Sequence, residues 1–341
     1  LLAHKQEILK MRLRETEGMD LILKKKFGFL FVLAVLVMVL TAGCGSEKKA
    51  GSRPEEKALP PLVVGVMPDV DSLPLIFAWE LGYFKEEGVE VKIEQFKSAV
   101  DRDAAIQAGA VDGAVSDMLA VAFFREGGID VKITSLTNGN YQVIGAANES
   151  AGTMKELAGK DIAISRNTII EFVTDNALAM EGLTAESVNK KAIPKIPARL
   201  EMMAAGKLAA ATLPEPIASM AIKNGGHVIA DAADMGINPG ILMFTGKAIK
   251  EKKSSIAALY RAYDRAVKYL TETPAGEYMQ TVIDKGGFPA AVKDGITLPK
   301  YQAASMPSER DWQLCQKWLL DKKLTTKMLE FKDVTEDVSA K

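Results

Sequence analysis

Small polar and charged side chains stand at the ends of three strands that the first half of the sequence predicts. In parallel α/β sheets the carboxyl ends of the strands lie along one edge, and ligands bind where the loops leave that edge. Helices that follow such loops offer unpaired backbone N–H groups in their first turn. We therefore predict a ligand-binding loop at 69–73, although a βαβ unit without a site would look the same at any single loop. The three strand-end groups are Asp69, Asp71 and Ser72; Lys97 and Ser98; and Ser116 and Asp117.

Catalytic and metal-binding constellations are scarce in this composition. The 341 residues include two histidines, His4 and His227, far apart in sequence, and two cysteines, Cys44 and Cys315. Zinc clusters and disulfide frameworks need more cysteines than this. A formal charge of −1, without a basic stripe and interleaved aromatics, argues against nucleic-acid binding. We therefore expect no metal, no cofactor and no enzymatic activity.

The segment 62–96 contains the elements that must position the first loop. An apolar run over 62–66 predicts a buried strand, and Pro74 suits the first turn of the next helix, where its missing N–H would have had no partner. Asp71 or Ser72 is the expected cap of that helix. Strict alternation over 89–94 predicts a half-buried second strand.

The rest of the body repeats this strand–helix rhythm in two sets, which predicts an α/β protein with two lobes. The expected parts are a first lobe over 62–146, a second lobe over 147–238, a return to the first lobe with C-terminal helices over 239–331, and a tail over 332–341. A strand over 193–196 and a short helix over 154–160 are among the expected elements. Two crossovers, near 144–147 and 236–242, would form a hinge, and ligands prefer the cleft between such lobes.

The N-terminal residues have the pattern of a secretory signal. Three lysines at 24–26 precede an apolar run over 27–40, which is short for a membrane span. The end, Thr41 to Cys44, resembles a bacterial lipobox, whose cysteine is acylated, although Thr41 stands where leucine is usual; an ordinary cleavable signal is the alternative. We expect an extension and signal over 1–43, starting at Leu1, Met11 or Met19, and a flexible, Pro/Gly/Ser-rich tether over 44–61.

An ordered series of short motifs runs through the body from 62 to about 331. It comprises Gly65, Pro74, Ala78, Gly82-Tyr83-Phe84, Gly88-Val89 and Val91; Gly109 and Val111-Asp112-Gly113-Ala114; Leu157, Gly159-Lys160 and 162–165; and Pro214-Glu215-Pro216. The series resembles the substrate-binding lipoproteins of ABC importers, in the nitrate/sulfonate/taurine and thiamine-precursor family. The resemblance implies a periplasmic-binding-protein-like type II fold and a permease with its ATPase as partners. It also implies a monomer, lipid-anchored through Cys44 outside the cytoplasm of a one- or two-membrane cell.

The resemblance also places the ligand between strand-end loops of both lobes. Charged residues of these loops are mostly acidic, and burying an anion beside unpaired carboxylates is costly. We therefore expect a small polar organic solute with an amine, amide or heterocyclic donor, thiamine-pyrimidine-like, although a sulfonate stays open. Phe96, Tyr141 and Phe172 are candidate flat contacts. The expected ligand-binding residues are Asp71, Ser72, Leu73, Lys97, Ser98, Ser116 and Asp117 in the first lobe, and Ser165, Asn167, Thr168 and Glu215 in the second.

Two other classes of function compete with solute import. A related branch with this fold makes the pyrimidine precursor of thiamine, so the first is an enzyme; no nucleophile with a base at readable spacing supports it. The second is a surface receptor for macromolecules, which would be expected to show repeats or exposed aromatic patches. Aromatic residues make up only 6% of the chain, which weakens that class.

Overall fold

The structure is a computed structural model that describes residues 58–296 and 298–338. These residues belong to one compact unit that begins at Lys57. The expected signal, Cys44 and most of the tether lie outside the described residues. No described helix combines the length and the apolar character needed to cross a membrane.

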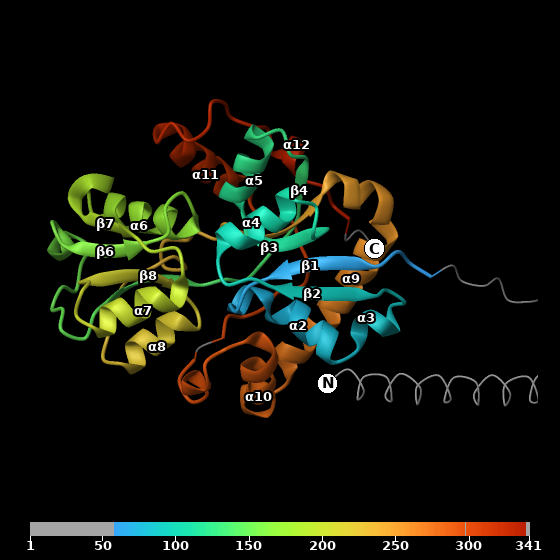
Figure 1. Ribbon diagram of the computed structural model, residues 1–341, viewed down its shortest axis with the longest axis horizontal. Coiled ribbons are helices and arrows are strands. Elements are labelled where there is room, and N and C mark those ends of the chain that lie inside the picture. The colour runs from blue at the N-terminus through green and yellow to red at the C-terminus, as the bar shows by residue number, and fades with distance from the viewer. Residues whose placement is uncertain (1–57, 297, 339–341) are drawn as a thin grey trace, which may run out of the picture. The chain divides into compact units, whose positions relative to one another are not determined.

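The first lobe is built on a five-stranded sheet with the order β2-β1-β3-β10-β4 (Figure 1). Strand β1 is parallel to β2 and β3, whereas β10 runs antiparallel to β3 and β4. The strands are β1 (Leu62–Val66), β2 (Val91–Gln95), β3 (Gly113–Asp117), β4 (Val131–Leu136) and β10 (Gly240–Thr245). Its helices are α2 (Leu73–Glu80), α3 (Tyr83–Glu86), α4 (Ala99–Gln107), α5 (Met118–Glu126), α9 (Gly246–Glu272) and α10 (Ala275–Gly286).

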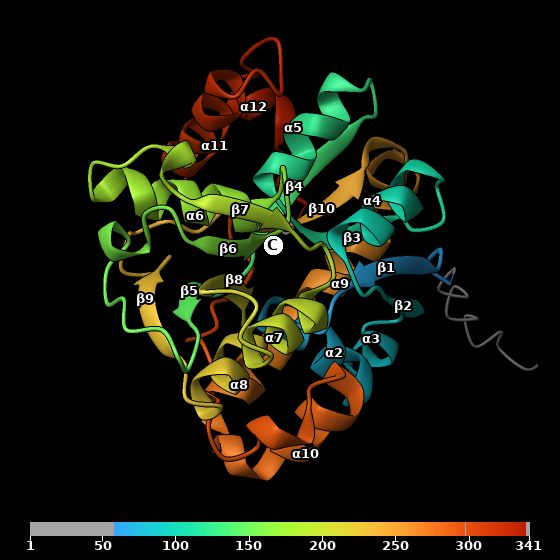
Figure 2. The same cartoon turned by 60° about the vertical axis from the view of Figure 1, so that its left-hand side comes forward.

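The second lobe is built on another five-stranded sheet, with the order β7-β6-β8-β5-β9 (Figure 2). Its strands are β5 (Tyr141–Gly145), β6 (Asp161–Ile164), β7 (Asn189–Ala192), β8 (Ala210–Pro214) and β9 (His227–Asp231). Its helices are α6 (Ile169–Met180), α7 (Ile196–Ala204) and α8 (Ile217–Lys223). Two mixed sheets of this kind confirm the predicted two-lobed α/β fold.

The remaining elements are the C-terminal helices and four 3-10 turns. The C-terminal helices are α11 (Glu309–Asp321) and α12 (Phe331–Val334). The 3-10 turns of the described residues are η1 (Val70–Ser72), η2 (Lys155–Leu157), η3 (Ala185–Ser187) and η4 (Ala290–Val292).

The first crossover lies earlier than the sequence predicted. Strand β5 pairs with β8 and β9 of the second sheet, so the chain changes lobe at 137–140 rather than near 144–147. The apolar run at 141–147 indicated a strand, but apolar character alone does not say which sheet a strand joins. The second crossover, at 232–239, overlaps the predicted one.

Three smaller predictions were wrong for local reasons. A strand was predicted at 193–196, but the edge strand of the second sheet is β7, and Ile196 begins α7. The sequence did not indicate β7, because an exposed edge strand needs no alternation of apolar residues. The expected helix at 154–160 is only the 3-10 turn η2. The C-terminal residues do not form a separate tail, since Thr335 bridges to Ile133 of β4 and Val338 is buried.

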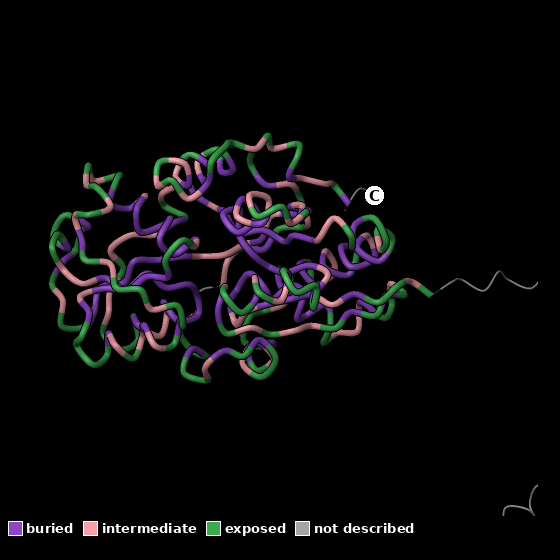
Figure 3. The backbone as a smooth tube through the Cα atoms, turned by 45° about the horizontal axis from the view of Figure 1, so that its top comes forward, coloured by how far each residue is buried: buried purple, intermediate pink, exposed green. Residues whose placement is uncertain are grey.

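Buried residues follow the strands of both sheets and the inner faces of their helices (Figure 3). One apolar cluster contains α5, β4 and α11 together with β6 and α6, so it continues from one lobe to the other. A second cluster packs α2, α9 and α10 against β1. The packing of these two clusters holds the two sheets in place, and the loops at the ends of their strands line a pocket.

Candidate ligand-binding site

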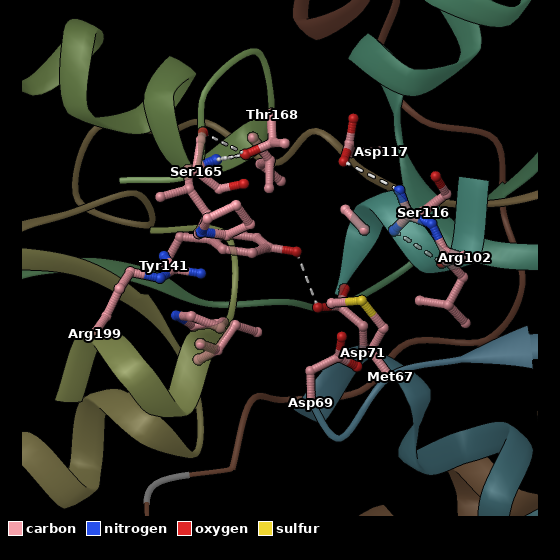
Figure 4. A pocket seen from close by; sticks show the side chains of 17 residues that line it. Met67, Asp69, Asp71, Arg102, Ser116, Asp117, Tyr141, Ser165, Thr168 and Arg199 are labelled. Atoms are coloured by element: carbon pink, nitrogen blue, oxygen red, sulfur yellow. Dashed lines mark hydrogen bonds and ion pairs between the residues drawn. The ribbon is translucent and has the colours of Figure 1, made fainter. Parts of the chain in front are cut away.

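Residues from both lobes line one pocket with a volume of about 520 Å³, including the space through which it opens (Figure 4). The first lobe contributes the loop after β1, the end of β3 and α4, and the second contributes the start of β5, the loop after β6 and the helix α7. The polar lining residues are Asp69, Asp71, Arg102, Ser116, Asp117, Tyr141, Ser165, Thr168 and Arg199.

Asp69 organises the loop after β1. Its Oδ1 accepts hydrogen bonds from the Ser72 backbone N–H (3.1 Å) and from the Ser72 hydroxyl (2.7 Å), so Asp69 caps η1. Ser72, one of the two predicted caps, does occupy the N-cap position of α2, but its side chain makes no capping hydrogen bond to that helix. Burial, and then the neighbouring Asp71 carboxylate, raise the pKa of Asp69 to about 8.

Asp71 connects the pocket to the first crossover and to the sheet of the second lobe. Its Oδ1 accepts a hydrogen bond from Thr137 Oγ1 (2.6 Å) in the first crossover, and its Oδ2 accepts one from Tyr141 Oη (3.1 Å) at the start of β5. A Cβ added at Gly139 or Gly240 would stand 2.4 or 2.9 Å from this carboxylate. Burial raises the pKa of Asp71, although both hydrogen bonds act against that shift. Asp71 therefore binds the two lobes to each other at the hinge.

Arg102 supplies a paired positive charge at the end of β3. Its Nε donates to Asp103 Oδ1 (2.8 Å), and its Nη2 lies 3.9 Å from Asp117 Oδ2. Burial alone would lower the pKa of Arg102, but Asp103 and Asp117 shift it upward. Asp117 also caps α5, where it accepts the backbone N–H of Ala120 (2.9 Å). The neighbouring hydroxyl of Ser116 is buried and has no hydrogen-bond partner among the described residues.

Arg199 supplies a different kind of positive charge on the second-lobe side. Its Nη1 donates to the Thr212 carbonyl oxygen (2.5 Å), whereas its buried Nε has no partner in the described part of the chain. Burial lowers the pKa of Arg199 to about 10, and no carboxylate compensates it. The loop after β6 forms the adjoining wall, where Thr168 Oγ1 donates to the Ser165 carbonyl oxygen (2.8 Å) and caps α6. The two lobes thus present an acidic wall and a wall with an uncompensated guanidinium.

The structure brings together part of the predicted residue set. Asp71, Ser116, Asp117, Ser165 and Thr168 line the pocket. The other predicted residues do not line it. Ser72 is hydrogen-bonded to Asp69, Leu73 packs in the core, and Ser98 caps α4. Lys97 and Asn167 are exposed, and Glu215 is hydrogen-bonded to Ser219 beside a separate cavity.

Sequence reasoning missed both arginines. Arg102 and Ile106 are the buried residues of α4, and Arg199 is buried in α7 with Ile196 and Met203. Each arginine therefore occupies an apolar position of its helical period, and that pattern is the signal which would have found it. Of the three aromatic candidates only Tyr141 lines the pocket, whereas Phe172 packs against Trp318 with ring centroids 5.7 Å apart.

Within residues 58–296 and 298–338, no three His, Cys, Asp or Glu side chains are grouped so that they could hold a metal ion. What the pocket offers is binding: buried hydrogen-bond donors and acceptors with charges of both signs, presented from two lobes.

Two α/β sheets that are joined by two crossovers and enclose a polar pocket define the periplasmic-binding-protein fold. The chain belongs to the family described as "NMT1/THI5 like", whose model matches residues 69–277. This match and the fold confirm the family resemblance that the sequence motifs carried. No curated protein matched the sequence.

Solved structures with the same fold include several binding proteins. The alkanesulfonate-binding protein SsuA from Xanthomonas axonopodis pv. citri, bound to MOPS, has 17% identity and a TM-score of 0.71, with 82% of this chain and 99% of that chain covered. The periplasmic aliphatic sulphonate binding protein SsuA from Escherichia coli has 14% identity, a TM-score of 0.67, and 81% and 92% coverage. The nitrate-binding protein NrtA from Synechocystis PCC 6803 has 15% identity, a TM-score of 0.59, and 74% coverage of each chain.

Proposed function

We propose that this chain is the solute-binding component of an ABC importer, which captures a small polar organic solute between its lobes and delivers it to a permease with its ATPase. The pocket supports this proposal most directly, because both lobes line it and a solute held there would contact both lobes of a hinged protein. Family membership and the binding proteins of the same fold support it as well.

The charges of the pocket favour a solute with an amine or heterocyclic N–H donor. Asp69, Asp71 and Asp117 are buried, and of these three only Asp117 lies within ion-pair distance of a described guanidinium group, Arg102 Nη2 at 3.9 Å. A donor or cation beside Asp69 would offset the cost of its burial, which raises its pKa to about 8. On the opposite wall Arg199 has no carboxylate and suits an acceptor on the same solute. An aminopyrimidine has both kinds of group on one ring.

Isothermal titration of the mature chain with the aminopyrimidine of thiamine, taurine and nitrate tests this proposal. We expect the aminopyrimidine to bind, and Asp69→Asn to weaken it by roughly tenfold or more, because a buried charge-assisted hydrogen bond contributes about 1.5–3 kcal/mol. Lys97→Gln serves as the control, since Lys97 is exposed and lies outside the lining. Tight binding of nitrate alone would contradict the ligand class. Scattering curves that stay unchanged across a broad panel of metabolites would contradict solute capture itself.

We also propose that the protein acts as a lipid-anchored monomer outside the cytoplasm. The support is the sequence pattern that ends at Cys44 and the periplasmic setting of the sulphonate-binding protein with the same fold. Mass spectrometry of the membrane-extracted protein is expected to find an N-terminal, acylated Cys44. An unmodified mature chain in the soluble fraction would refute the anchor, and Cys44→Ala is the matched control.

A further inference from the structure

A cluster of charges joins α6 of the second lobe to the C-terminal end of α11. Lys322 Nζ, directly after α11, donates to Glu171 Oε1 (2.6 Å) and to Asp175 Oδ2 (3.2 Å). Trp318 Nε1 donates to Asp175 Oδ2 (3.0 Å). We call this contact the α6–α11 clasp; its members are Glu171, Asp175, Lys190, Trp318 and Lys322.

Helix α11 is attached to the first lobe, so the clasp crosses between the lobes. The helix packs directly against α5, and its buried residues Trp312, Cys315 and Leu319 lie in the apolar cluster that α5 shares with α6. After the helix, the Thr326 backbone N–H and hydroxyl donate to Glu126 at the end of α5 (3.1 and 2.5 Å). Figures 1 and 2 both show α11 beside α5 on one side and near α6 on the other.

The charges within the clasp balance each other. Lys190 Nζ donates to Glu171 Oε1 (3.1 Å) and also bonds to Asp175 Oδ1, so two ammonium groups face two carboxylates. Glu171 is 4% exposed. Burial alone would raise the pKa of Glu171, but the hydrogen bonds from Lys322 and from the Asn167 backbone lower it below its ordinary value. A carboxylate buried at this depth keeps its charge only while these partners stay in place.

Glu171 also holds the loop that forms the second-lobe wall of the pocket. Its Oε2 accepts the backbone N–H of Asn167 (2.8 Å). Asn167 has a φ of 57°, in the left-handed region that non-glycine residues seldom adopt. Ser165 and Thr168, on either side of this turn, line the pocket. One side chain therefore touches both the pocket loop and a lysine from the opposite lobe.

We propose that Glu171 is a positioning residue for the pocket: Lys322 of the first lobe fixes the Glu171 carboxylate, and Glu171 fixes the turn at 165–168. Docking of α11 on α6 then sets the shape of the ligand-contacting loop before any solute arrives. The inference concerns the pocket of the proposed function, but it needs no ligand to be tested.

Hydrogen–deuterium exchange of the ligand-free chain, followed in the peptide that contains 165–170, tests the inference. We expect Lys322→Met to raise the exchange rate of this peptide by roughly fivefold, which is the change that weakening one hydrogen bond would produce. Lys322 has no hydrogen bond to these residues in the described structure, so the effect would have to pass through Glu171. Lys317→Met is the matched control, because Lys317 lies on the solvent face of the same helix and, within the described part of the chain, pairs only with Asp321. Lys322→Arg keeps the charge and is expected to retain protection.

Exchange at 165–170 that stays at the wild-type rate in folded Lys322→Met would overturn the proposal. Should that variant lose its fold by circular dichroism, Glu171→Gln decides instead, since it keeps the shape of the side chain and removes the negative charge that Lys322 and Lys190 hold. Faster exchange at 165–170 in Glu171→Gln supports the proposal, and unchanged exchange rejects it. Neither result bears on whether a solute binds, so failure here is distinguishable from failure of the proposed import function.

Discussion

Asp69→Asn is expected to make the ligand-free protein more stable than the wild type at pH 8, with the difference vanishing near pH 4. The pKa of Asp69 is raised from 3.8 to about 8 by burial and by the Asp71 carboxylate. A raised carboxyl pKa means that the folded state binds a proton that the unfolded state has released. The stability from this group is therefore complete below pH 4 and is lost as the pH rises towards 8.

Asparagine resembles the protonated carboxyl group at every pH, and its side-chain oxygen still accepts from Ser72. The gap between variant and wild type should widen by at most about 1.4 kcal/mol per pH unit, the limiting slope for one proton. A total of a few kcal/mol corresponds to roughly 5–10 °C in melting temperature for a protein of this size. Thermal unfolding followed by circular dichroism between pH 4 and pH 8 measures it.

The exposed Asp321 provides the control, since Asp321→Asn changes the same atoms at a site that is 62% exposed. Its melting curve should run parallel to that of the wild type. Parallel curves for Asp69→Asn would show that Asp69 is ionised in the folded protein.

Gly139→Ala is expected to destabilise the protein by about 1–3 kcal/mol, the usual cost of overpacking a buried site. The new Cβ would stand 2.4 Å from Asp71 Oδ2 and 2.7 Å from its Oδ1. The carboxylate cannot move aside freely, because Thr137 and Tyr141 hold its two oxygens. Urea unfolding of the two proteins gives the difference in the free energy of unfolding.

A double-mutant cycle identifies the cause of this loss. In an Asp71→Ala background the added methyl group meets no carboxylate, so Gly139→Ala should cost much less there. Gly276→Ala is the matched control, since no atom lies within 4 Å of its added Cβ. Additive losses in the cycle would mean that Asp71 does not brace the crossover.

Asp71 shows how much of the pocket could be predicted from polar residues at the ends of strands. The pattern of polar residues after β1 and β3 correctly predicted Asp71, Ser116 and Asp117 in one pocket, because parallel strands place their carboxyl ends at the same edge. It did not predict that Asp71 would bond to Thr137 and Tyr141 across the crossover. Those contacts join residues 66 and 70 positions apart, and no local pattern records them.

Glu171 is a second residue whose partners the sequence pattern did not predict. It lies in the first turn of α6, directly after a pocket loop, yet its carboxylate faces Lys190, Lys322 and the backbone of Asn167. The helical period places Glu171 on α6 but does not state which neighbour covers that face. The partner comes from α11, 151 residues later in the chain.

Most strands and helices, the two-lobed class and the loops that carry polar groups could be predicted without the structure, because hydrophobic period and capping residues act within a few positions of the chain. Long-range packing was needed to show that β5 belongs to the second sheet, that Arg102 and Arg199 line the pocket, and that Ser98 and Glu215 do not. Sheet membership and burial depend on contacts between residues far apart in sequence, and their free energy is settled only when the whole chain has packed.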